Sequence, residues 1–144
     1  MYRPSAPQLR ALGWIYVAYI MCYLLRKNFP IMLPSLAAAS LLTHAQAGVV
    51  SSVFEVCIGA VKFFCGVFVD RSPSPGLLLA KCLGVAGVAC LLMQLVFWTL
   101  TGEALAPARV ALVSVLWSAN GAGQAVAWPA LARVFLAWFP DVAT

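Results

Sequence analysis

Four long apolar stretches dominate this 144-residue sequence and limit what it can fold into. They run from about 11 to 36, 47 to 69, 76 to 100 and 108 to 139. Each exceeds the roughly 20 residues that a helix needs to cross the hydrocarbon core of a bilayer, which is about 30 Å thick. A chain in lipid must also satisfy its own backbone hydrogen bonds, and a helix does so internally. We therefore predict an all-α, polytopic membrane protein with four transmembrane helices.

The composition also indicates that most of the surface faces lipid. Apolar residues make up 64% of the chain and charged residues only 9%, whereas soluble proteins are roughly half apolar and about a quarter charged. The formal net charge is +5, but several basic residues lie inside apolar stretches and form no basic stripe on a polar face. The lipid bilayer is therefore an expected partner, and nucleic acid is not.

The sequence shows no pattern typical of an enzyme or of a cofactor-binding protein. Its five cysteines are irregularly spaced and form no CxxC pair, so we expect free thiols that pack as small apolar residues. His44 lies in a predicted connection and is interpreted as a solvated residue. The sequence has no metal-ligand cluster, catalytic triad motif or phosphate-binding glycine loop. We expect no enzymatic activity, no cofactor and no metal site.

The charges of the short connections predict an orientation in the membrane. Arg3, Arg10 and Arg71 fall on one side, and the opposite connections carry only Arg109, near an edge. Because basic residues accumulate in cytosolic loops, the N-terminus is predicted to be cytosolic. No address signal distinguishes the endoplasmic reticulum from the plasma membrane. A rival interpretation is a cleaved signal peptide ending near "SLAAAS", although two cations interrupt its apolar region.

Those two cations, Arg26 and Lys27, lie deep in the first apolar stretch. A charge near the bilayer centre costs about 2.5–3.5 kcal/mol on insertion scales and usually faces a bundle interior or a watery cavity. On a helix, Tyr16, Tyr19 and Tyr23 share the face of the arginine. This face is interpreted as a binding surface, because guanidinium suits phosphate or carboxylate. The alternative is an aromatic packing stripe with a snorkelling arginine.

The second apolar stretch carries ionisable residues on one helical face. Glu55 and Lys62 are seven residues apart and point the same way. Lys62 is a second interior cation, and Glu55 is interpreted either as its structural contact or as a proton-titrating group. The stretch ends with Gly66, Asp70 and Arg71 in "GVFVDRSPSPG". A carboxylate at this helix end is interpreted as a conformational latch or as a simple polar boundary.

The fourth stretch carries an amide face. Asn120, Gln124 and Trp128 are each four residues apart and so share one side of a helix. Amides inside a membrane helix often hydrogen-bond a neighbouring helix or a ligand. Arg133 lies off this face near the predicted cytosolic end, where we expect it to snorkel.

Three separated motifs together resemble a known family. "YLLRKNFPIMLPSL", "VKFFCGVFVDR" and "NGAGQAVAWPA" stand in the order and spacing of the organophosphate:phosphate antiporter branch of the major facilitator superfamily. That branch includes bacterial glycerol-3-phosphate transporters and the glucose-6-phosphate translocases of the endoplasmic reticulum. The Arg-Lys pair with its flanking residues is specific to the branch, whereas Gly-x-x-x-Asp-Arg is general to the superfamily. The resemblance covers essentially the whole chain.

The resemblance implies roles for individual residues. Arg26 matches the phosphate-binding arginine of the first helix, and Lys62 matches a second-helix lysine that helps to hold the anion. The other implied substrate-binding residues are Tyr19, Tyr23, Lys27, Gln124 and Trp128. The implied gating residues, which help to close the cytosolic side, are Gly66, Asp70 and Arg71.

The sequence also departs from the family pattern. Ala125 and Ala130 replace the usual Gly and second Pro, and Glu55 is not the usual residue at its position. The family has twelve helices in two halves, whereas this chain supplies four. Its fifth-helix histidine and seventh-helix arginine have no counterpart here.

The resemblance implies the exchange of an organophosphate, such as glucose 6-phosphate or glycerol 3-phosphate, for inorganic phosphate by alternating access. Residues 1–144 would then be part of the N-terminal bundle of a longer protein, partnered by the missing helices. The alternatives are a non-transporting partner or regulator of a full-length relative, and an incomplete gene model.

Overall fold

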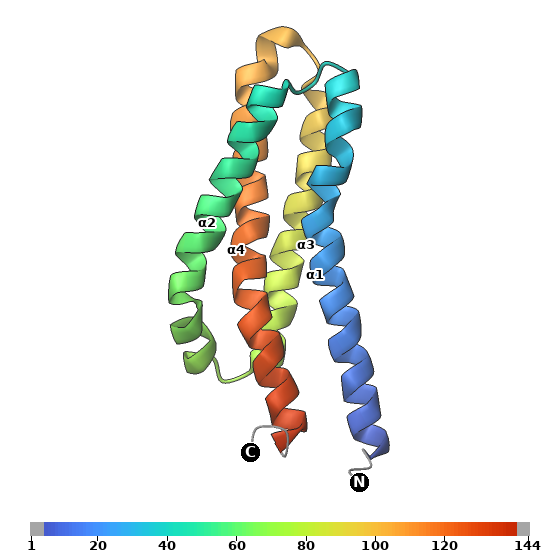
Figure 1. Ribbon diagram of the computed structural model, residues 1–144, viewed down its shortest axis with the longest axis vertical. Helices are drawn as coiled ribbons and strands as arrows, with labels where there is room; N and C mark the ends of the chain where they lie inside the picture. The colour runs from blue at the N-terminus through green and yellow to red at the C-terminus, as the bar shows by residue number, and fades with distance from the viewer. Residues whose placement is uncertain (1–4, 141–144) are drawn as a thin grey trace.

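The computed structural model describes residues 5–140, which form four long helices and one short 3-10 helix (Figure 1). The elements are α1 (Ala6–Ala38), α2 (His44–Arg71), α3 (Pro75–Thr99), η1 (Glu103–Leu105) and α4 (Ala106–Trp138). All four long helices are long and apolar enough to cross a membrane, and residues 5–140 contain no strand. The prediction of an all-α membrane bundle is confirmed.

Polar residues cap the helices beyond the predicted apolar limits. At the start of α2, the Thr43 hydroxyl accepts a hydrogen bond from the Gln46 backbone N–H at 3.2 Å, and the Gln46 side chain accepts one from the Thr43 N–H at 3.0 Å. At α1, the Gln8 side chain accepts a hydrogen bond from the Ser5 N–H at 2.8 Å. Such reciprocal caps satisfy backbone donors at the helix end, so these helices begin earlier than their apolar stretches.

Helix α4 is the central element of the bundle, and α2 and α3 pack against it along most of their length (Figure 1). Two glycines of α4 allow this close packing. A Cβ atom built at Gly123 would lie 2.7 Å from the carbonyl oxygen of Cys82 on α3, and one at Gly121 would lie 2.9 Å from the ring of Phe54 on α2. Helix α1 makes lighter contacts with α4 and α3.

Two buried clusters hold the bundle together. In the first, the Trp117 ring of α4 stacks on Phe54 of α2 at a centroid distance of 4.7 Å and lies 5.2 Å from Phe29 of α1. The second cluster includes Val69 of α2 and Leu131 of α4. On α2, Lys62 lies between Ile58 of the first cluster and Val69 of the second, so apolar packing fixes this helix on both sides of the lysine.

Large apolar side chains cover the outside of the bundle. Trp14 is 74% exposed, and Phe63 and Trp98 are each 85% exposed. An apolar exterior of this extent indicates contact with lipid rather than with water. Together with the four membrane-length helices, it shows an integral multi-pass membrane protein.

The start of α1, the connection between α2 and α3 and the end of α4 lie at one end of the bundle (Figure 1). The Gln8 side chain donates a hydrogen bond to the Trp138 carbonyl oxygen at 3.2 Å, which joins α1 to α4 there. Arg10 and Arg71 belong to this end, and Arg3 lies outside the described residues. The cytosolic placement of this end stays a prediction.

Arg109 stabilises the connection at the opposite end. It is buried at the start of α4, where its guanidinium donates hydrogen bonds to the carbonyl oxygens of Leu100 at 2.6 Å and Gly102 at 3.4 Å. These carbonyls follow the end of α3, whose last backbone acceptors have no partner within the helix. Arg109 therefore joins α3 to α4 and is not a free loop charge.

Candidate functional site

A cavity of about 200 Å³ lies between α1, α2 and α4. Its lining residues are Cys22, Tyr23, Arg26, Ile58, Lys62, Gln124, Ala125 and Trp128. Five of the residues predicted to bind substrate are in this set, and they come from three different helices. The arrangement places the guanidinium of α1 and the ammonium of α2 around one space, with an amide and an indole of α4 beside them.

An aromatic wall extends this cavity along α1. The Tyr19 ring is 4.8 Å from the Tyr23 ring and 5.6 Å from the Trp128 ring, measured between centroids. Tyr19 therefore supports two lining residues without lining the cavity itself. Tyr16 lies 6.5 Å from Tyr19 and is largely exposed, so it continues the stripe away from the cavity.

Lys27 does not line the cavity that holds Lys62. It lines a second cavity of about 160 Å³, together with Glu55 and Ser51 of α2. Arg26 lines both cavities. The two adjacent cations of α1 thus share the second cavity, and only Arg26 also reaches the first, because consecutive residues of a helix point about 100° apart.

A hydrogen-bonded amide pair lies behind Arg26. Gln124 donates through Nε2 to Asn120 Oδ1 at 2.5 Å, and Asn120 donates through Nδ2 to the Leu25 carbonyl oxygen at 3.1 Å and to Cys90 Sγ at 3.3 Å. Asn120 is fully buried. The pair ties α4 to α1 and α3 at the residue before Arg26, as expected for an amide inside a membrane helix.

Replacing Asn120 by leucine is expected to destabilise the bundle by about 1–3 kcal/mol, because the buried Gln124 amide loses its partner and the bond from Asn120 to the Leu25 carbonyl oxygen is lost. Thermal unfolding of the detergent-solubilised protein measures this effect. Gln94→Leu is the matched control, since Gln94 is an exposed amide on α3. An Asn120→Leu protein that unfolds at the same temperature as the control would show that the amide pair adds no stability.

Arg133 contacts the end of α2, and its snorkelling to the membrane surface stays a prediction. It donates a hydrogen bond through Nη1 to the Val69 carbonyl oxygen at the end of α2 and lies 4.0 Å from Asp70 Oδ1. The sequence places Arg133 near the predicted cytosolic end of α4 but indicates no partner for it. The partner belongs to α2, and the phase of α4 does not show which neighbouring helix lies beside Arg133.

The predicted gating residues surround this contact at the end of α2. Asp70 is the partner of Arg133, and Arg71 lies exposed beside it. A Cβ atom at Gly66 would meet no heavy atom of the described chain within 4 Å. The latch remains a prediction, with Arg133 added to its expected members.

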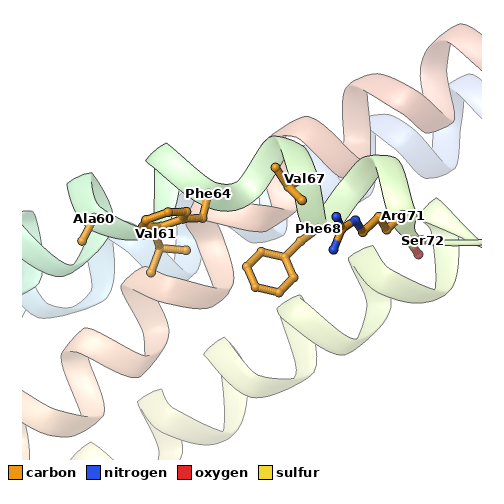
Figure 2. A pocket seen from close by; sticks show the side chains of 7 residues that line it. All are labelled: Ala60, Val61, Phe64, Val67, Phe68, Arg71 and Ser72. Carbon is orange, nitrogen blue, oxygen red and sulfur yellow. The ribbon is translucent and has the colours of Figure 1, made fainter.

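A larger groove of about 560 Å³ runs along the second half of α2 (Figure 2). Its lining residues are Ala60, Val61, Phe64, Val67, Phe68, Arg71 and Ser72. Figure 2 shows them on one helix and the connection that follows it. Because its lining includes a single cation and mostly apolar side chains, it lacks the paired charges that an anion requires. The smaller cavity around Arg26 and Lys62 is therefore the candidate site.

Comparison with known proteins identifies the family. The profile of the Major Facilitator Superfamily matches residues 15–143. A glycerol-3-phosphate transporter of Haemophilus influenzae is 30% identical over 125 residues, which cover 87% of this chain and 24% of that protein. A probable hexose phosphate transport protein of Chlamydia trachomatis is 26% identical over 132 residues, which cover 92% of this chain and 26% of that protein.

A third relative is named as a sensor and not as a transporter. The membrane sensor protein UhpC of Escherichia coli is 26% identical over 125 residues, which cover 87% of this chain and 26% of the sensor. No solved structure matches the chain. The chain spans about a quarter of the length of the curated relatives that it matches.

These relatives are transport and sensor proteins rather than enzymes. They confirm the resemblance that the three sequence motifs indicated. Because the superfamily profile covers nearly all of the described helices, the chain belongs to the Major Facilitator Superfamily.

Proposed function

We propose that this chain is part of a transporter that moves an organophosphate across a membrane in exchange for inorganic phosphate. The observation that carries the proposal is the cavity that joins Arg26 of α1 to Lys62 of α2. Relatives named as glycerol-3-phosphate and hexose phosphate transporters support the substrate class. Glucose 6-phosphate and glycerol 3-phosphate are the proposed candidates.

The chemistry of the cavity suits a phosphate group. A phosphate monoester carries about −1.5 to −2 charges at pH 7. The Arg26 guanidinium offers a planar fork for two phosphate oxygens, and Lys62 offers a compact charge from another helix. Gln124 uses one of its two amide hydrogens for Asn120, so the other is available to a ligand. Tyr23 adds a hydroxyl, which can donate or accept a hydrogen bond.

Transport requires an opposing half that rocks against this bundle around the site. We propose that residues 1–144 correspond to the first four helices of the N-terminal bundle, with the N-terminus in the cytosol. The remaining helices of the family would supply the other side of the phosphate site. Opening and closing of the cytosolic side would make and break the Asp70–Arg133 contact beside Gly66 and Arg71.

A second candidate function is sensing without transport, as a partner or regulator of a full-length relative. The similarity to a membrane sensor protein favours it. In this case the same cavity would bind a phosphate compound, and the bound state would be communicated to another protein rather than lead to flux.

Both candidates are tested with the complete reading frame that contains these residues, in proteoliposomes loaded with inorganic phosphate. We expect uptake of labelled phosphate that glycerol 3-phosphate and hexose phosphates inhibit, while free glycerol and glucose do not. Saturable binding of the phosphate compounds without flux would favour the sensor. Neither binding nor flux would contradict both functions.

A further inference from the structure

A carboxylate stands next to the candidate phosphate site and has no role in the function proposed above. Glu55 lines the cavity of about 160 Å³ that also contains Arg26 and Lys27. It is the one acidic residue among those that line this cavity and the neighbouring one around Lys62. Arg26 lines both cavities, so the carboxylate and the proposed ligand have this arginine as a common neighbour.

Packing fixes the position of Glu55 beside α1. The preceding residue, Phe54, is buried, and its ring stacks on Trp117 at 4.7 Å. Trp117 in turn packs on Phe29 of α1 at 5.2 Å, and both aromatic residues line the same cavity as Glu55. This aromatic contact joins α2 to α1 through Trp117 of α4 and fixes the backbone of α2 next to Glu55, whose own side chain is exposed.

Glu55 lies close to the cations without pairing with any of them. Among residues 5–140, the one carboxylate oxygen within 4.0 Å of a basic group belongs to Asp70, beside Arg133. Glu55 therefore shares a cavity with Arg26 and Lys27 without a locked contact to either. A carboxylate held in this way can lower the charge of the site without blocking access to it.

A carboxylate at position 55 changes the net charge of the residues that line the two cavities. Arg26, Lys27 and Lys62 contribute three positive charges, and Glu55 reduces the total to two. Two positive charges match a phosphate dianion. Exchange also requires binding that is weak enough to permit release.

We propose that Glu55 is a resident counter-ion of Arg26 and Lys27 that weakens anion binding and thereby permits release. The proposal rests on the phosphate-binding function assigned to the Arg26–Lys62 cavity. Glu55 balances the cations when the site is empty and repels the anion when it is filled. It is a residue that sets affinity, and it makes no contact with the ligand.

Equilibrium binding of labelled inorganic phosphate to the complete protein in lipid nanodiscs tests this role. Glu55→Gln removes the charge and keeps the shape. We expect roughly tenfold tighter binding, the scale of one charge–charge interaction at an effective dielectric constant between those of protein and water. The gain should shrink as salt is added. Glu55→Asp keeps the charge and should bind phosphate like the native protein.

Glu103→Gln is the matched control, because Glu103 is an exposed carboxylate on η1, in the connection between α3 and α4. It should leave phosphate affinity unchanged. Equal phosphate affinity of the native and Glu55→Gln proteins would overturn the counter-ion role of Glu55 and leave the proposed phosphate-binding function standing. Weaker binding by Glu55→Gln would also overturn it, since Glu55 would then assist the ligand. A native protein that does not bind phosphate would contradict the proposed function. It would also contradict the counter-ion role, which rests on that function.

Discussion

Replacing Arg26 by lysine is expected to reduce phosphate exchange by the complete protein to background while leaving the bundle folded. Lysine keeps the positive charge but loses the planar fork that binds two oxygens of one phosphate. A hydrogen bond between charged groups contributes about 1.5–3 kcal/mol, so the loss of one corresponds to about a tenfold to hundredfold loss of affinity. Labelled phosphate exchange in proteoliposomes measures the effect.

Arg10→Lys is the control for this substitution. Arg10 lies on the same helix but is exposed near its start and away from the cavity, so the same chemical change there should preserve exchange. Near-normal exchange by Arg26→Lys would show that charge alone suffices and would contradict a forked contact with phosphate.

Replacing Gly123 by alanine is expected to give a large loss of stability. The new Cβ atom would lie 2.7 Å from the Cys82 carbonyl oxygen. That oxygen belongs to the backbone of α3, so the two helices must move apart, and overpacking of this kind typically costs about 1–3 kcal/mol. Thermal unfolding in detergent should show a clearly lower midpoint for Gly123→Ala than for the native protein.

Gly84→Ala is the matched control on α3, because a Cβ atom there would meet no heavy atom of the described chain within 4 Å. It should unfold at or slightly above the native midpoint, since alanine favours the helix by up to about 1 kcal/mol. If both alanine variants unfold together, the close approach of α3 and α4 at Gly123 is not a source of stability.

Helix phase predicted much of the candidate site from the sequence. Arg26 and Tyr23 share one face of α1, and Gln124 and Trp128 share one face of α4. The structure places all four around one cavity with Lys62. Helix phase succeeded here because ionisable residues deep in an apolar helix usually face the bundle interior or a watery cavity, so their direction indicates where the cavity lies.

Helix phase did not predict the neighbours of a charged residue when those neighbours belong to another helix. It also did not show that two residues on one face can lie too far apart along the axis to meet. Glu55 and Lys62 share a face, but seven residues separate them by about 10.5 Å along the axis, and they line different cavities. Lys27 joins Glu55 instead of Lys62. The contact of Arg133 with the end of α2 depends on how the helices are placed side by side, which a single helix pattern does not contain.

The central claim is that Arg26 and Lys62 together bind a phosphate group. Equilibrium binding of labelled phosphate to an Arg26→Gln/Lys62→Gln double variant of the complete protein in nanodiscs tests it most directly. Lys81→Gln serves as control, because Lys81 is an exposed cation on α3 outside both cavities. We predict saturable binding by the native and Lys81→Gln proteins and none by the double variant. Undiminished binding by the double variant would contradict the account.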